Sequence, residues 1–275
     1  MSKNNRVNKI FYHIIAILFS FIALLPFVWM LSTSFKTSGA LLAIPIEWIP
    51  KKPTFDAYFR LFSNEGILRA MINSILVTAG SICVSLLSSS MAAFAFSKIK
   101  FRGSNLLFLI FLSSMMIPSQ VIFIPLYLIM NEIHLTNTLF AVILPCVFQA
   151  FAVFMLKQQM MSISDTYLDA ASIDGASLMK MFFNIILPMC NTALVTLAII
   201  VGMGAWNDYL LPLVLLTTKD NYTLPIILNS LNGQFSTEYN LLMAGALVTM
   251  LPLLIFYAVA QKYFSTGLQM GGIKG

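Results

Sequence analysis

Long apolar stretches alternate with short polar connectors along the whole chain, a pattern typical of a helical membrane protein. A helix that crosses a bilayer needs about 20 mostly apolar residues. None of the long stretches alternates apolar and polar positions as a barrel strand does. Pro and polar residues interrupt the third and the fifth stretch, so the pattern leaves the ends of those two helices open. We expect six spanning helices, at Ile10–Leu31, Met71–Phe96, Asn105–Met130, Thr138–Leu156, Met189–Leu211 and Leu241–Gln261.

The composition agrees with lipid as the surrounding solvent. Hydrophobic residues make up 59% of the chain and charged residues only 9%, whereas soluble domains carry roughly a quarter charged residues. The net charge is +6, but the Lys and Arg residues lie in the short connectors. They form no patch that would bind nucleic acid, so we expect a lipid bilayer and no nucleic acid as a partner.

The distribution of Lys and Arg predicts the orientation. The N-terminal connector and every second one after it hold ten of the 16 basic residues, and the others hold six. Basic residues favour the cytoplasmic side, so both termini are expected in the cytoplasm of a bacterial or archaeal cell, with the protein in its plasma membrane. Ile10–Leu31 is too long for a signal-peptide core and no small-x-small cleavage site follows it, so we interpret it as a retained span.

The connector 162–188 is the longest polar interruption on the cytoplasmic side. Asp165 falls at the start of a helical pattern, where a carboxylate favours the positive end of the helix dipole. The spacing places Leu168, Ala171, Gly175 and Leu178 near one face, and small residues there would allow a close approach from outside. Asp174-Gly175 is a turn signal, so a helix break is expected near Gly175. The alternative is an amphipathic loop that lies on the membrane surface.

The order of residues in this connector resembles the cytoplasmic signature loop of ABC importer permeases, in which Glu-Ala-Ala is followed by Gly and then by Ile-x-Leu-Pro. The matching residues are Asp169, Ala170, Ala171, Gly175, Ile185, Leu187 and Pro188. Asp174 and Ala176 fit the version found in sugar transporters, whereas Asp169 replaces the usual Glu by a shorter carboxylate. Similarity to maltose-type carbohydrate permeases extends over most of the chain, in the segments Pro50–Phe62, Met116–Tyr127, Ala205–Leu215 and Gln261–Gly275.

This resemblance implies an all-α, polytopic membrane protein with six transmembrane helices and the type I ABC importer permease fold. Residues 1–68 would form an N-terminal span with an extracellular loop. The permease domain would cover 69–262 and include the coupling loop 162–188, and a cytoplasmic tail would follow at 263–275. The implied partners are a second related permease, two ATP-binding subunits and an extracellular sugar-binding protein.

The resemblance also implies that the signature loop docks on an ATPase subunit. The residues expected to couple are Asp165, Asp169, Ala170, Ala171, Asp174, Gly175, Ala176 and Pro188. The chain has no GxxxxGK[ST] phosphate loop, so we expect a permease and not an enzyme. ATP and Mg would bind to the partner ATPase subunits, and no cofactor is expected on this chain.

Two further sets of residues are candidates for contact with the transported molecule or its carrier. The outer loop that contains Asn232, Gly233, Gln234 and Phe235 matches the place where such permeases reach into the binding protein, and a solvated loop is the alternative. Polar residues inside spans either pair between helices or line a path, and the path candidates are Gln120, Gln149, Asn207 and Asp208. No Lys or Arg lies inside an expected span, which favours a neutral sugar or oligosaccharide over a strongly anionic substrate such as glycerol phosphate. The alternative is an importer of glycerol phosphate or another polyol.

Two other classes of membrane protein fit less well. A stand-alone secondary transporter usually has buried ionisable residues and two matching halves, and neither is evident. A membrane-embedded enzyme needs a nucleophile, a base or a metal cluster near the interface. The chain has two distant histidines, no Cys or His pattern typical of a metal site and no acidic cluster in a span, so no metal site is expected.

Overall fold

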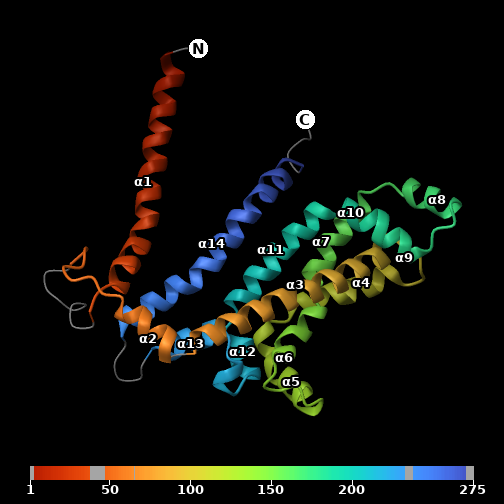
Figure 1. The fold of residues 1–275 in the computed structure, drawn as a ribbon. Coiled ribbons are helices and arrows are strands. Elements are labelled where there is room, and N and C mark those ends of the chain that lie inside the picture. Colours follow the sequence, from red (N-terminus) through yellow and green to blue (C-terminus); the bar gives the residue numbers. More distant parts are fainter. Residues whose placement is uncertain (1–2, 38–46, 65, 233–237, 271–275) are drawn as a thin grey trace. The chain divides into compact units, whose positions relative to one another are not determined.

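The computed structural model describes residues 3–37, 47–64, 66–232 and 238–270. The described parts are helices and connectors (Figure 1). They fall into two compact units. The first combines Met1–Ile67 with Ile227–Leu251, and the second combines Leu68–Ile226 with Pro252–Gly275. The first unit therefore joins two segments that are far apart in the sequence.

The first unit contains α1 (Lys3–Ser34), α2 (Asp56–Asn64), the end of α13 (Leu224–Ser230) and the first part of α14 (Tyr239–Met270). Polar contacts tie α2 and the loop after α1 to the start of α14. Both guanidinium nitrogens Nη1 and Nη2 of Arg60 donate to the carboxylate of Glu238, at 2.6 and 3.0 Å. Nδ2 of Asn240 donates to the backbone oxygen of Lys36 at 3.3 Å.

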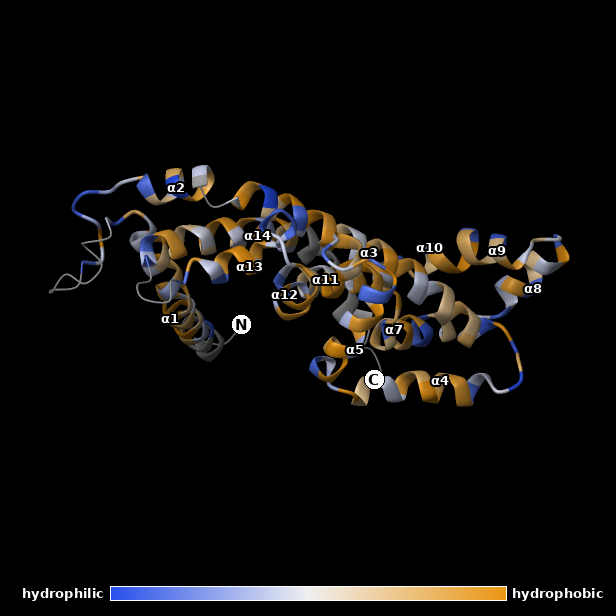
Figure 2. Cartoon of the chain, turned by 90° about the horizontal axis from the view of Figure 1, so that it is seen from below, coloured by the Kyte–Doolittle hydropathy of each residue, from blue (hydrophilic) through white to orange (hydrophobic). Residues whose placement is uncertain are grey.

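The second unit holds the remaining helices and the second part of α14. In chain order they are α3 (Ile67–Lys98), α4 (Ser104–Ser113), η2 (Ser114–Met116), α5 (Ser119–Glu132), α6 (Leu139–Ile143), η3 (Leu144–Val147), α7 (Ala150–Met161), α8 (Thr166–Ile173), α9 (Leu178–Met181), the π-helix η4 (Phe182–Ile186), α10 (Leu187–Met189), α11 (Asn191–Asn207), α12 (Leu210–Leu215) and η5 (Lys219–Asn221). Figure 2 shows hydrophobic residues along the helices and hydrophilic ones concentrated in connectors and at helix ends.

By length and composition, the described helices give three spans, or up to six if each of three bent helix pairs is one span. Three are single helices, Phe11–Ser34, Ile67–Lys98 and Tyr239–Ala258. The other three are bent pairs: Ser104–Met116 with Ser119–Glu132 at 103°, Leu139–Val147 with Ala150–Met161 at 41°, and Leu178–Met189 with Asn191–Asn207 at 79°. The third and fifth stretches, which Pro and polar residues interrupt in the sequence, show the two largest bends.

The largest bend has a local cause at Pro118. A proline disfavours the helical conformation for the residue before it, and Ile117 is extended at φ −86° and ψ 119°. Pro118 also lacks an N–H that could continue the helix, and α5 begins directly after it. The fourth span breaks where Phe148 and Gln149 leave the helical region, just after the 3₁₀ turn η3, which contains Pro145.

Two hydrophobic cores hold the second unit together. One joins the end of α3 to α4, α7, η4 and α11 through residues such as Phe94, Phe108, Leu156, Phe182 and Leu197. The other joins the start of α3 to α5, α6, α12 and α13; its members are Val77, Met130, Ala141, Val142, Leu215, Leu216 and Ile226. These two cores fix the helices around the cavity that lies between them.

Candidate translocation cavity and coupling segment

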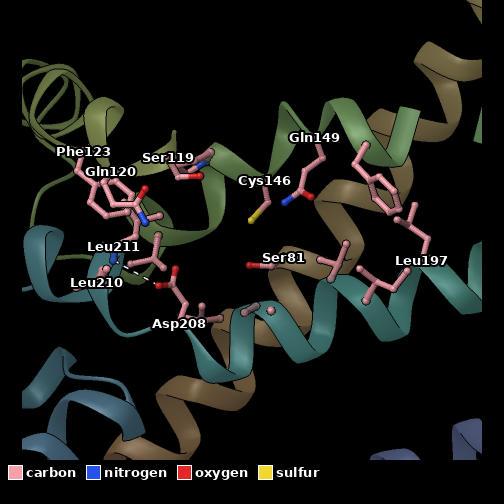
Figure 3. A pocket seen from close by; sticks show the side chains of 18 residues that line it. Ser81, Ser119, Gln120, Phe123, Cys146, Gln149, Leu197, Asp208, Leu210 and Leu211 are labelled. Atoms are coloured by element: carbon pink, nitrogen blue, oxygen red, sulfur yellow. Dashed lines mark hydrogen bonds between the residues drawn. The ribbon is translucent and has the colours of Figure 1, made fainter. Parts of the chain in front are cut away.

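A cavity of about 420 Å³ lies within the second unit (Figure 3). Val77 and Val142 belong to one hydrophobic core and Leu197 and Val201 to the other, and all four line it. The volume falls within the roughly 300–1,000 Å³ of small-molecule sites. The cavity therefore lies between the two cores and is large enough for a small ligand.

Six polar side chains from five separate segments face this cavity. They are Ser81 on α3, Ser119 and Gln120 at the start of α5, Cys146 in η3, Gln149 before α7, and Asp208 after α11. Figure 3 shows Asp208 opposite Gln120, with Ser81, Cys146 and Gln149 further along the same space. The sequence pattern did not single out Ser81, Ser119 or Cys146, because small polar residues are common at helix contacts in membranes.

The breaks in the third and fourth spans place most of these polar groups. Ser119 and Gln120 follow the bend at Pro118, and Cys146 and Gln149 flank the break before α7. Non-helical backbone at membrane depth is tolerated where it is buried in protein or lines a cavity. The breaks therefore serve to present polar groups to the cavity.

Three of the four residues predicted to line a path meet here, and one does not. Gln120, Gln149 and Asp208 line the cavity, whereas Asn207 is exposed and its Nδ2 donates to the backbone oxygen of Met203 at 2.8 Å. Oδ1 of Asp208 accepts a hydrogen bond from the N–H of Leu211 at 3.4 Å. Among the residues that line the cavity in the described structure there is no Lys or Arg, so Asp208 supplies its only formal charge.

The connector 162–188 folds into α8, α9, η4 and α10. Hydrogen bonds from one lysine fix the position of the residues before α8. Lys98, at the end of α3, has a side chain that is only 3% exposed. Its Nζ donates to the backbone oxygen of Ile163 and to Oδ1 of Asp165, each at 2.6 Å. The ammonium group beside it lowers the pKa of the Asp165 carboxyl below its usual value. Asp165, predicted to couple to an ATPase, therefore already pairs with Lys98 of its own chain.

The end of α8 is set by Gly175. The N–H of Gly175 donates to the oxygen of Ser172, and the N–H of Ala176 donates to the oxygen of Ala171, at 3.0 and 2.9 Å. This is the Schellman pattern, which needs a left-handed residue after the helix, and Gly175 has φ +76°. The helix break expected near Gly175 is therefore confirmed. A Cβ there would meet no atom within 4 Å, so the backbone conformation and not crowding within the chain requires glycine.

The small residues of the connector do not all share one face. Leu168 packs against the first hydrophobic core and Ala171 is buried, so this side of α8 faces the chain itself. Ala170 is exposed, and the outward side also carries Tyr167 and Ile173, of which Ile173 is 87% exposed. The exposed side of α8 is thus more apolar than the sequence analysis expected.

The remaining predicted coupling residues lie on or near the surface. Asp169, Asp174 and Pro188 are exposed, and Ala176 is half-buried. In the outer loop, Asn232 is exposed, whereas Gly233, Gln234 and Phe235 lie outside the described residues. Within the described part of the chain, no group of three His, Cys, Asp or Glu side chains could hold a metal ion.

The long apolar helices and bent helix pairs are typical of a multi-pass membrane protein. Residues 85–269 match the family described as binding-protein-dependent transport system inner membrane component, and the chain belongs to this family. It is 36% identical over 259 residues to the arabinooligosaccharides transport system permease protein AraQ of Halalkalibacterium halodurans, with 93% of each chain covered.

Two further comparisons extend this result. The chain is 32% identical over 269 residues to the probable starch degradation products transport system permease protein AmyC of Thermoanaerobacterium thermosulfurigenes, with 98% of each chain covered. A chain of a bacterial ABC transporter involved in the import of the acidic polysaccharide alginate has a TM-score of 0.83 and 24% identity, and the match covers 96% of this chain and 99% of that one. The predicted fold class, an ABC importer permease, is confirmed.

Proposed function

We propose that this permease carries a neutral oligosaccharide through the cavity that contains Asp208. The observation that carries this proposal is the lining: uncharged polar groups and aromatic rings, with one carboxylate and no cation among the described lining residues. Hydroxyl-rich sugars need hydrogen-bond donors and acceptors, and buried sites that pair such groups discriminate strongly against molecules that lack them. Phe123 and Phe151 offer apolar rings to the C–H faces of a sugar.

The same lining disfavours the alternative substrates. A phosphorylated polyol carries negative charge, which an aspartate in a water-poor space repels and which Lys or Arg would attract. The transporter of similar fold is involved in the import of an acidic polysaccharide, whereas two relatives are named for arabinooligosaccharides and starch degradation products. Because the charge of the lining is negative, the two relatives named for arabinooligosaccharides and starch degradation products indicate the substrate class better than the transporter of the acidic polysaccharide does.

The energy would come from partner subunits. We infer that the exposed side of α8, with Asp169, Ala170 and Ile173, docks on one of two ATP-binding subunits, which hold ATP and Mg. A second related permease would complete the path, and an extracellular sugar-binding protein would deliver the substrate through the loop that begins at Asn232. In this arrangement both termini and α8 are cytoplasmic, which cysteine labelling in intact and opened cells would test.

Reconstituted uptake tests the substrate class. The chain is placed in proteoliposomes with its second permease, ATPase and binding protein, and labelled neutral and uronic-acid oligosaccharides are compared. We expect ATP-dependent uptake of the neutral sugar alone. Preferred uptake of the acidic sugar would refute the substrate class, and ATP-independent uptake by the chain without partners would refute the importer mechanism itself.

A further inference from the structure

The end of α1 and the loop after it bury a lysine side chain. Lys36 is only 1% exposed and is one of the largest fully buried side chains among the described residues. Its Nζ lies 4.0 Å from the centre of the Trp29 ring, and no described carboxylate lies within ion-pair distance of it. A buried ammonium group is costly unless it is paired, and an aromatic ring compensates only part of that cost.

Lys36 lines a cavity of about 210 Å³ together with two more lysines. The lining consists of Lys36, Thr37, Glu47, Pro50, Lys51 and Lys52. Glu47 pairs with Lys51 at 2.6 Å, and this ammonium group lowers the pKa of the Glu47 carboxyl. Three lysines against one glutamate leave a formal charge of +2 on the lining. The charge of Lys36 also lowers the pKa of Glu47, although only Lys51 forms an ion pair with Glu47 among the described residues. The net positive lining therefore favours an anion, with Lys36 and Lys52 as the cations that form no ion pair with Glu47.

An apolar groove of about 360 Å³ lies on the same unit. Phe21, Leu24, Leu25 and Val28 of α1 form it together with Trp48. Trp29 connects the groove to the lysine cavity, because its ring packs edge-on against Trp48 with 5.2 Å between ring centres and also lies under Lys36. One surface thus presents an apolar groove along a membrane-spanning helix and, at the end of that helix, a cationic cavity.

We propose that the groove and the lysine cavity together bind one anionic phospholipid, with its phosphodiester beside Lys36 and Lys52 and an acyl chain along Phe21–Val28. Tryptophan is enriched at both membrane interfaces, where phosphates lie, and a cationic lining attracts a phosphodiester by opposite charge. A free phosphate would use only the cavity. A zwitterionic lipid would bring its own cation to a lining that is already positive.

Native mass spectrometry tests this inference by identifying the lipids that stay bound to the assembled transporter after its release from nanodiscs. Nanodiscs that hold equal amounts of phosphatidylglycerol and phosphatidylcholine are compared for the wild type, Lys52→Gln, and Lys36→Met/Lys52→Gln. We expect about tenfold more retained phosphatidylglycerol than phosphatidylcholine on the wild type, equivalent to 1.4 kcal/mol. The preference should fall in Lys52→Gln and disappear in the double variant. Lys219→Gln, which changes another exposed connector lysine, is the matched control and should retain the preference.

Three outcomes would overturn the proposal. They are equal retention of the two lipids by the wild type, unchanged preference in the double variant, and release of the bound lipid by excess inorganic phosphate. Lys36→Arg keeps the charge and should keep the preference, so it separates loss of binding from loss of folding. Sugar uptake is measured in parallel with a neutral oligosaccharide, so the lipid site and the substrate class can fail independently.

Discussion

The cavity and the coupling connector are built in opposite ways. The connector is one continuous segment, from Ser162 to Pro188, and its shape depends on local signals such as the left-handed Gly175. The cavity takes its polar lining from five segments between Ser81 and Asp208, and helix breaks bring them together. Substitutions in the connector should therefore weaken the proposed coupling to the ATP-binding subunits, whereas substitutions in the cavity should weaken recognition of the sugar.

The largest expected effect tests whether the connector depends on α3. Lys98→Met removes charged hydrogen bonds to Ile163 and Asp165, and each charged bond contributes about 1.5–3 kcal/mol. We expect transport to fall by roughly ten- to a hundredfold, while ATP hydrolysis by the assembled transporter continues. The ratio of sugar imported to ATP hydrolysed measures this uncoupling.

Lys100→Met is the matched control for Lys98→Met. Lys100 is an exposed lysine two residues further along, and it acts on Asp165 through its charge, with no hydrogen bond to it among the described contacts. It should transport like the wild type. If Lys98→Met changed the apparent KM for sugar and left the ratio of import to hydrolysis intact, α3 would not transmit force to the connector.

A graded series at Gly175 tests the local signal. A non-glycine residue in the left-handed region costs about 1–2 kcal/mol, and asparagine tolerates it better than alanine or valine. Because a Cβ at this position meets nothing within the chain, backbone strain should order the variants. We expect ATPase binding to weaken in the order Asn, Ala, Val, by up to roughly 5- to 30-fold.

Binding of the purified ATPase to the permease pair in nanodiscs measures this order. Gly103 is a matched control, since it also has a positive φ and open space but lies outside the connector. Equal loss with asparagine and valine would show that the close approach of the ATPase, and not backbone strain, requires glycine.

The cavity is tested by a pair of neighbouring residues. Asp208→Asn keeps the acceptor for the Leu211 N–H but removes the charge. It should raise the apparent KM for the sugar-loaded binding protein by roughly fivefold, about 1 kcal/mol. Asn207→Ala should leave the KM unchanged, because Asn207 does not line the cavity. Transport measured against concentration of sugar-loaded binding protein distinguishes the two, and equal effects would remove Asp208 from recognition.

The smallest expected effect is the pH dependence of the Lys98–Asp165 pair. Since the pKa of Asp165 is lower in the folded protein than in the unfolded chain, its contribution to stability is complete above the unfolded pKa of about 3.9. It is lost as the pH falls through the depressed value below that. The melting temperatures of the wild type and Asp165→Asn should therefore differ at pH 7 and 5, and the difference should begin to shrink as the pH falls below about 4. A difference in melting temperature that does not change with pH would show that the Lys98–Asp165 ion pair does not contribute to stability.

Several features could be predicted from single stretches of sequence. The three single spans and the three bent helix pairs follow from apolar length, and the break at Pro118 follows from the chemistry of proline. The end of α8 follows from Asp174-Gly175, because a left-handed turn residue is a local requirement. The order of residues from Asp169 to Pro188 also indicated the permease class, which the family match confirms.

Other features depend on residues that only folding brings together. Gln120, Gln149 and Asp208 were candidates among several polar residues in spans. Asp208 stood out only as an ionisable residue, and nothing local distinguished the two glutamines from Asn207. Ala171 resembled a docking residue, yet it packs inward because α8 needs an apolar side against its own core. The pairing of Lys98 with Asp165 joins positions 67 residues apart, a separation at which no helical periodicity operates.

The sequence by itself determined that this is a helical, multi-pass membrane protein, because apolar length and local turn chemistry act within one segment. The order of residues from Asp169 to Pro188 added the resemblance to importer permeases. Only the tertiary structure decided which polar residues share the cavity, which side of α8 is exposed, and where Lys36 meets Trp29 and the apolar groove. These depend on packing between segments that are distant in the chain, and the energy of a buried polar group or charge is set by the neighbours that packing supplies.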